Sequence, residues 1–149
     1  LEPNQIRYSA VHELIQDDRL CVIIGINTSK QRAPLNKDEL VYTIMIRQPD
    51  FVTKEIVERA FETVEKKKPH PFLNEVTFDV FQDGSSVQML HIGPYDDEPQ
   101  SFELMNEFTK NNNLERVSLQ HREIYLSDFR KVEPAKLKTV LRYKVRSIE

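Results

Sequence analysis

The segment "QMLHIGPYDDEP" (residues 88–99) decides the fold, because it joins a strand pattern directly to a helix start. A short, mostly apolar run leads up to His91, which is typical of a buried β-strand. Gly93-Pro94 is a turn dipeptide, and an aspartate followed by Pro99 is typical of the first turn of a helix. The segment therefore predicts a strand, a tight turn and a helix in immediate succession.

Two side chains of this segment are candidates for a ligand site. Histidine ionises near neutral pH, which suits a general base, and His91 stands at the strand end. The alternative is that His91 only bonds a backbone group there. Tyr95 either lies at the mouth of a site or plugs the start of the helix. The segment alone leaves both alternatives open.

The chain after this segment predicts one helix and two strands. The helix has a buried face at helical spacing and ends at "KNNN" (residues 110–113). "RVSLQHREIYLSD" (residues 116–128) predicts one long strand, "EPAKLK" a short helical turn, and "TVLRYKV" the last strand. The predicted buried face of the helix consists of Phe102, Leu104, Met105 and Phe108.

The chain before this segment mixes strands and helices. Apolar residues from Ile6 to Leu14 predict an amphipathic helix over residues 5–18, followed by strands "RLCVIIGIN" (19–27) and "LVYTIMIRQ" (40–48). Thr53 is placed to cap a second helix. "EVTFDVF" (75–81) and "VQMLHIG" (87–93) predict a hairpin around Asp83-Gly84. The predicted buried stripe of the second helix is Ile56, Val57, Ala60, Phe61 and Val64.

The order of these elements predicts the fold class. Strands and helices follow one another without strict β-α-β alternation, which favours an α+β domain with a largely antiparallel sheet. The length of 149 residues predicts a single domain. We expect a first module at about residues 1–50, a linking helix at 53–68 and a second module at about 75–146, with the first strand of the first module missing from the chain as given.

Glu123 is the strongest candidate site residue within the predicted strand 116–128. With a period of two, it shares one face with Val117, Leu119, His121 and Tyr125, and this face begins apolar. An inward carboxylate is costly unless it is paired or hydrogen-bonded. The alternative to a ligand site is an ion pair with Arg142 on the next strand. Taken by itself, Tyr125 is expected to be a core or rim residue, and His121 is expected to be partly exposed.

Composition excludes several classes of function. The net charge is −3 and the basic residues are scattered, so no surface for nucleic acid or an anionic membrane is expected. Cys21 is the single cysteine, which favours a reducing, cytoplasmic location. No long apolar run predicts a membrane span. Three glycines leave no phosphate-binding loop, and the four histidines show no metal-ligand spacing, so we expect no cofactor and no metal.

Four motifs taken together resemble the GyrI-like small-molecule-binding domain family. They are "HIGPYDDEP", "HREIYLSD", "KLKTVLRYKV" and "MIRQPDFVT", the last of which resembles a stand-alone branch without a DNA-binding region. The resemblance covers the chain from Val41 to its C-terminus. It implies two β-α-β-β modules that form a curved, largely antiparallel sheet around a central ligand cleft.

The resemblance also implies a set of ligand-binding residues. Glu123 corresponds to a buried carboxylate at the pocket floor, with Tyr125 as its neighbour. His91 and Tyr95 fall on the His-x-Gly-Pro-Tyr motif near the mouth. The further residues expected to bind ligand are Met89, Tyr143 and Tyr42.

The ligands implied by the resemblance are bulky, apolar and often cationic small molecules, bound for sensing or sequestration. The alternative function is hydrolysis of strained electrophiles such as cyclopropane-bearing alkylating agents, with Glu123 and Tyr125 as catalytic residues. The branch commonly has Leu-Glu-Gly-Leu-Trp where this chain has residues 23–27, so Ile24 replaces a second glutamate and Asn27 a tryptophan. A protein-interaction module is the third alternative.

Overall fold

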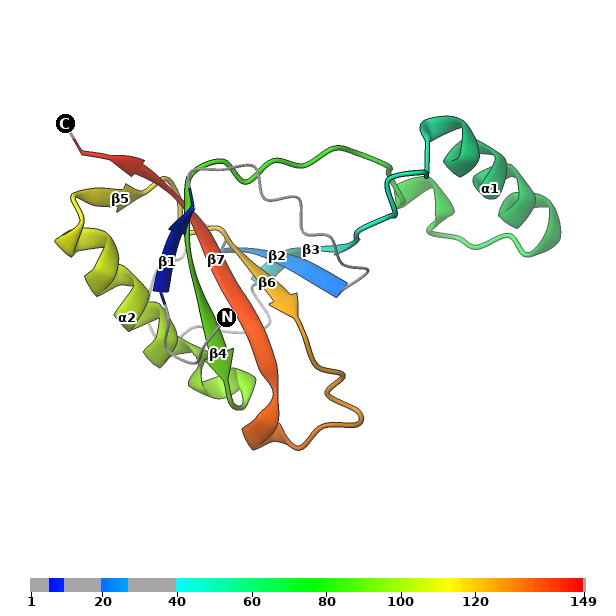
Figure 1. Cartoon of the computed structure of the whole chain (residues 1–149). Coiled ribbons are helices and arrows are strands. Elements are labelled where there is room, and N and C mark those ends of the chain that lie inside the picture. The colour runs from blue at the N-terminus through cyan, green and yellow to red at the C-terminus, as the bar shows by residue number, and fades with distance from the viewer. Residues whose placement is uncertain (1–5, 10–19, 27–39, 149) are drawn as a thin grey trace. The chain divides into compact units, whose positions relative to one another are not determined.

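The structure, a computed structural model, describes residues 6–9, 20–26 and 40–148, with side chains from residue 43 onward. The chain divides into two compact units. One unit comprises residues 1–47 and 83–149, and it contains the sheet and helix α2 (Figure 1). The other comprises residues 48–82 and contains helix α1. No helix in the described part of the chain has the length and apolar character needed to cross a membrane.

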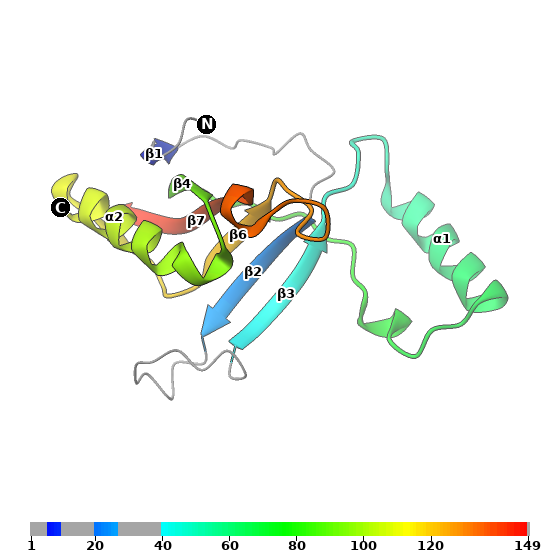
Figure 2. The same cartoon turned by 90° about the horizontal axis from the view of Figure 1, so that it is seen from below.

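The sheet has seven strands, in the order β1-β4-β7-β6-β2-β3, and β5 pairs with one end of β7. Every described pair is antiparallel, which confirms the predicted α+β class with a largely antiparallel sheet. Figure 2 shows β2 and β3 side by side at the end of the sheet farther from α2. The strands are β1 Ile6–Ser9, β2 Leu20–Ile26, β3 Leu40–Ile46, β4 Ser86–Ile92, β5 Leu114–Arg116, β6 His121–Tyr125 and β7 Lys138–Ser147.

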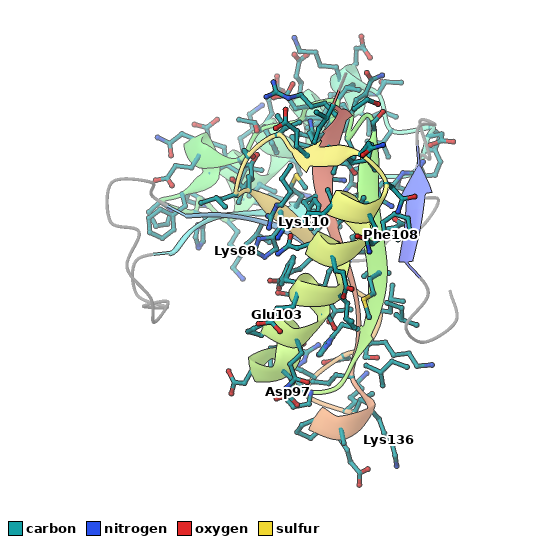
Figure 3. All side chains as sticks on the ribbon, turned by 90° about the vertical axis from the view of Figure 1, so that its left-hand side faces the viewer. Lys68, Asp97, Glu103, Phe108, Lys110 and Lys136 are labelled. Carbon is teal, nitrogen blue, oxygen red and sulfur yellow. The ribbon has the colours of Figure 1, made fainter. Side chains whose placement is uncertain are left out.

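Helix α2 (Glu98–Asn111) begins after Asp97 and carries Pro99 in its first turn, as predicted. A single turn of 3₁₀ helix, η4 (Tyr95–Asp97), leads into it. The helix runs along β4 and β7, which lie behind it in Figure 3. Met105 is fully buried against the sheet, whereas Leu104 is 46% exposed, so its placement on the buried face was wrong.

The sheet has two different faces. The face under α2, here called the helix-side face, contributes the main core together with Met105 and Leu114. The opposite face, here called the far face, holds a smaller cluster of Leu90, Ile124 and Val140. The strand register places these residues on the helix-side face: Val87, Met89, His91, His121, Glu123, Tyr125, Thr139, Leu141, Tyr143 and Val145.

The predicted long strand 116–128 is broken, which corrects the expectation drawn from its alternation. Arg116 pairs with Val145 and Arg122 with Arg142, so six steps along this segment match three along β7. The excess of three residues lies within the loop 117–120. Because this excess is odd, the break moves residues before it to the other face relative to a continuous strand. Val117, predicted to lie on the face of Glu123, is 54% exposed, and Arg116 lies on the helix-side face instead.

Two predictions for other segments were also wrong. Residues 6–9 form β1 rather than the start of a helix, and the remainder of the predicted helix lies outside the described residues. β1 pairs with one edge of β4, and β7 pairs with the other. No edge of β4 is therefore left for residues 75–81, and these form no strand; Val80 among them is 88% exposed.

In the unit of residues 48–82, helix α1 (Lys54–Lys67) begins after Thr53 as predicted, and the turn η3 (Leu73–Glu75) follows it. No residue of α1 is buried, so the predicted buried stripe was wrong. Val57 and Phe61 are half-buried, and Ala60 is exposed. An apolar stripe is buried only where a second element packs on it, and within this unit the described residues form one α-helix and one short 3₁₀ turn.

Candidate functional site

Glu123 is a buried carboxyl in the middle of β6, with only 5% of its surface exposed. The strand's period places His121 and Tyr125 on the same face, two residues before and after it. The hydroxyl of Tyr125 donates to Oε2 of Glu123 at 2.6 Å, and Nε2 of His121 lies 3.1 Å from Oε1. Both carboxyl oxygens therefore have partners on their own strand.

These hydrogen bonds favour the ionised form of Glu123. Burial raises the pKa of this carboxyl, but the bonds to His121 and Tyr125, together with smaller contributions from the charge of His121 and from Glu98, hold the pKa below its usual range. Burial, together with the bond to Glu123, raises the pKa of Tyr125 far above its usual value. Tyr125 therefore remains a proton donor, and the site holds a negative charge at neutral pH.

The start of α2 brings two further groups to Glu123. Glu98, the first residue of α2, is buried, with 7% of its surface exposed, and its side chain contributes to lowering the pKa of Glu123. The ring of Tyr95 lies 5.5 Å from that of Tyr125, tilted by 59°. Burial, and then the charges of Glu98 and Glu123, raise the pKa of Tyr95. The turn at residues 93–97 thus positions a phenol and an acid over β6.

The other side of the site continues as a row of rings. Phe102 of α2 meets the His121 ring edge-on at 4.7 Å, and it stacks at 6.5 Å on Tyr143 of β7. The guanidinium of Arg116 lies 4.0 Å above the Tyr143 ring. The break after β5 places Arg116 on this face, so a cation of the protein already occupies one face of Tyr143.

The alternative ion pair between Glu123 and Arg142 is wrong. Glu123 is opposite Leu141 in the register, and Arg142 is opposite Arg122, so the two side chains point to different faces of the sheet. On the far face, Arg142 bonds Gln88 and pairs with Asp83 at 2.8 Å. The carboxylate on the helix-side face is therefore not neutralised by Arg142.

His91 connects the strand end, the turn and the helix. Its Nδ1 lies 2.9 Å from the hydroxyl of Ser101 in α2, and its Nε2 lies 3.1 Å from the carbonyl oxygen of Pro94. Since both ring nitrogens bond protein groups and the residue is 4% exposed, this geometry matches the alternative of a strand-end hydrogen bond. Gly93 makes the turn possible with a φ of 140°.

The seven residues predicted for the site divide into groups. Glu123, Tyr125 and Tyr95 lie together. Met89 and Tyr143 are 1% exposed within the core beneath α2, and the Tyr143 hydroxyl bonds Thr109 at 2.8 Å. Of the remaining two, His91 bonds Ser101 and Pro94. Tyr42 lies opposite Ile24 in the register of β3, and its side chain is outside the described part of the structure.

Sequence reasoning missed two residues of this cluster. His121 is two residues before Glu123, so the period of two was a usable signal, although the strand alone predicted a partly exposed histidine. Glu98 is far from Glu123 in the sequence, and only the position of α2 over the sheet brings them together. Within the described residues, no group of three or more metal-ligating side chains is arranged to hold an ion.

Beyond β6, the two described residues of β3 on the helix-side face, Ile44 and Ile46, are apolar. The register aligns Glu123 with Val22 of β2 and Val22 with Ile44 of β3. Ile44 is 62% exposed and Ile46, two residues on, is 60% exposed. An ionised carboxylate thus lies two strands away from exposed apolar side chains on the same face. This combination suits a molecule with a large apolar body and a positive charge.

Comparisons with known proteins identify the family. The GyrI-like small molecule binding domain family matches residues 5–146. None of the curated proteins matches the chain. A solved structure of an uncharacterized conserved protein from Listeria innocua is 36% identical, with a TM-score of 0.78 over 87% of this chain and 64% of that one.

Two further structures from Listeria innocua are described as hydrolases. One is 34% identical, with a TM-score of 0.73 over 87% of this chain and 62% of that one. The other is 35% identical, with a TM-score of 0.75 over 87% and 63%. The chain thus spans less than two thirds of the length of these proteins. Since the family match extends over almost all of its residues, this chain belongs to the GyrI-like small molecule binding domain family.

Proposed function

We propose that this protein binds bulky, apolar, positively charged small molecules beside Glu123. The observation that carries the proposal is a buried carboxylate whose ionised form is favoured. Its hydrogen-bond partners are His121 and Tyr125, neither of which has a fixed positive charge. The effective dielectric next to the buried Glu123 is lower than in water. A ligand cation bound there would therefore be attracted to the carboxylate more strongly than in water.

Aromatic and apolar side chains support the same class of ligand. The rings of Tyr95 and Tyr125 form a tilted pair next to the carboxylate, and an aromatic face attracts a delocalised cation. Ile44 and Ile46 add exposed apolar surface on this side of the sheet. We propose that the charged end of the ligand lies at Glu123 and that its apolar body extends over β2 and β3.

The charge requirement can be tested with two probes of the same shape. Tetraphenylphosphonium is a bulky apolar cation, and tetraphenylborate is an anion of nearly identical form. Calorimetric titration of each into the protein should give a clear preference for the cation, by about tenfold or more. Equal affinity for both probes would refute a charged site, and no binding of either would favour a protein-interaction role for the exposed apolar face.

Hydrolysis is the second candidate, favoured by the two related structures described as hydrolases and by the acid next to Glu123. Glu123 would take a proton from water as the water attacks an electrophilic carbon, and a protonated neighbour would donate to the leaving group. Ile24, where the branch commonly has a second glutamate, weakens this candidate. Incubation of a cyclopropane-bearing alkylating agent in ¹⁸O-labelled water tests it: labelled ring-opened product formed by wild type but not by Glu123→Gln supports turnover, and equal product in both refutes it.

A further inference from the structure

Arg116 is a half-buried cation on the helix-side face, and the proposed binding of a cation at Glu123 does not use it. Its guanidinium carbon lies 4.0 Å from the centre of the Tyr143 ring and 5.9 Å from that of Phe102. One terminal nitrogen, Nη2, donates to the carbonyl oxygen of Leu119 at 3.2 Å. The Nε of Arg116 is buried and has no hydrogen-bond partner among the described residues. The described part of the chain thus leaves one of its donors without an acceptor.

The lack of a counter-charge distinguishes Arg116 from four other arginines of the same unit. Each of those four pairs with a carboxylate: Arg122 and Arg142 with Asp83, Arg130 with Asp128, and Arg146 with Glu115. Arg116 makes no ion pair with any described residue. Taking a charge out of water is costly unless the charge is paired. An anion from outside the chain would supply the partner that the described residues do not.

The break after β5 holds Arg116 in this position. Arg116 lies opposite Val145, whereas a continuous strand from Glu123 would have turned it to the far face. Leu119, whose carbonyl oxygen accepts from the guanidinium, belongs to the loop 117–120 that makes the break. An irregularity in strand pairing often redirects a side chain next to a functional site. The loop therefore both turns Arg116 to the helix-side face and fixes its guanidinium there.

Arg116 and Glu123 lie at opposite ends of one row of rings. Phe102 is in the middle of the row, 5.9 Å from the guanidinium of Arg116 and 4.7 Å from the ring of His121. Nε2 of His121 in turn lies 3.1 Å from the carboxyl of Glu123. The row thus has a positive charge at one end and a negative charge at the other.

The register gives the scale of the separation between the two charges. The residues opposite Arg116 and Glu123 are Val145 and Leu141, four positions apart on β7, which is about 13 Å at 3.3 Å per residue. The guanidinium lies over Tyr143, which is two positions from Leu141, or about 7 Å. A ligand that meets both charges therefore needs ends of opposite charge roughly 7–13 Å apart.

We propose that Arg116 binds an anionic group of the same ligand whose positive charge lies at Glu123. The preferred ligands are then amphoteric, with a cation and a carboxylate on one apolar body. The proposal rests on the proposed function and names the ligand class of the same site. A guanidinium binds a carboxylate through two parallel hydrogen bonds, for which Nε is one of the available donors. The same fixed charge repels a second positive charge on the ligand.

The anionic end is tested with two probes that share one cation. Carboxybutyl-triphenylphosphonium is a zwitterion at neutral pH, and its methyl ester is a cation of nearly the same size. Calorimetric titration of both probes into wild type and Arg116→Gln gives one affinity ratio, acid over ester, for each protein. This ratio should be about tenfold or more higher in wild type. Equal ratios in the two proteins would overturn the proposal.

Arg146→Gln is the matched control for this experiment. It removes an arginine from the same strand pair, at a register position next to that of Arg116 but on the other face of the sheet, with 69% of its side chain exposed. The control should keep the wild-type ratio. A loss in Arg146→Gln equal to that in Arg116→Gln would mean that the probes sense only the overall charge of the protein, and it would overturn the assignment to Arg116.

A probe without a cation separates this proposal from the proposed function. Phenylbutyrate should shift one arginine Nε signal in nitrogen-15 NMR, in wild type and in Glu123→Gln alike, and this signal should be missing in Arg116→Gln. If the phosphonium probes do not bind but phenylbutyrate shifts the signal, the cation site is refuted and the anion site at Arg116 stands. If tetraphenylphosphonium binds in a Glu123-dependent way but phenylbutyrate leaves the signal unchanged, the proposed function stands and the role of Arg116 is refuted.

Discussion

Removing one hydroxyl should show how strongly the site holds Glu123 in its charged form. In Tyr125→Phe the ring stays and the 2.6 Å hydrogen bond to Oε2 of Glu123 is lost. A hydrogen bond to a charged group contributes about 1.5–3 kcal/mol. At about 1.36 kcal/mol per pKa unit, the pKa of Glu123 should rise by about 1–2 units. The remaining environment is dominated by burial, which acts in the same upward direction.

The effect on stability has a pH dependence whose sign follows from the lowered pKa of Glu123. A carboxyl with a lowered pKa stabilises the fold above its unfolded-state pKa of about 4.3, and this contribution is lost as the pH falls through the folded-state pKa. The free energy of unfolding of Tyr125→Phe at neutral pH should therefore be lower than that of wild type by about 1.5–3 kcal/mol. The difference from wild type should narrow in acid, where Glu123 is protonated in both proteins.

Two measurements check this prediction. Carbon-13 carboxyl NMR gives the pKa of Glu123 in each protein, and urea unfolding at neutral and acidic pH gives the free energies. Tyr95→Phe is the matched control, because it removes a phenol hydroxyl next to the site that makes no hydrogen bond to Glu123. An unchanged or lower pKa of Glu123 in Tyr125→Phe would refute the reasoning, as would an equal shift in the control.

Two further predictions concern the stability of the sheet. Asp83→Asn should lower the free energy of unfolding, measured in urea, by about 3 kcal/mol. The reason is that Asp83 pairs with both Arg122 and Arg142, which lie opposite each other on the far face. A loss as small as that of Glu133→Gln, whose carboxylate pairs with Lys136 at the surface and is 74% exposed, would contradict this prediction. Thr139→Val should raise the free energy of unfolding by about 1 kcal/mol, because the buried Thr139 hydroxyl has no hydrogen-bond partner among the described residues. A lower melting temperature of the variant would contradict this prediction.

Most local elements were predictable because their signals are local. Asp97 and Pro99 predicted the start of α2, and the mostly apolar run after the Asp83-Gly84 turn predicted β4. Pairing between strands was less predictable, since it depends on which edges are already occupied. The segment 75–81 has a strand pattern, yet β1 and β7 pair with both edges of β4. Residues 6–9 were predicted as the start of a helix because apolar residues up to Leu14 follow them at helical spacing. Residues 6–9 form a strand instead.

The candidate site was predictable only in part. The resemblance indicated Glu123 and Tyr125, and the period of two placed them on one face. Apolar residues before Glu123 suggested that this face is buried, but the break at residues 117–120 puts Val117 elsewhere, so that reasoning was wrong although the burial of Glu123 is real. The effect of Glu98 on the pKa of Glu123 depends on how α2 lies over the sheet, which no local pattern predicts.

The central claim is that the charge of Glu123 binds cationic ligands, and Glu123→Gln tests it most directly. Tetraphenylphosphonium affinity should be measured by calorimetry for wild type, for this variant and for Glu133→Gln. The last variant removes an exposed carboxylate outside the site, on the residue just before η5 (Pro134–Lys136). We expect a loss of about tenfold or more, about 1.4 kcal/mol, in Glu123→Gln alone. Equal affinities in all three folded proteins would contradict it.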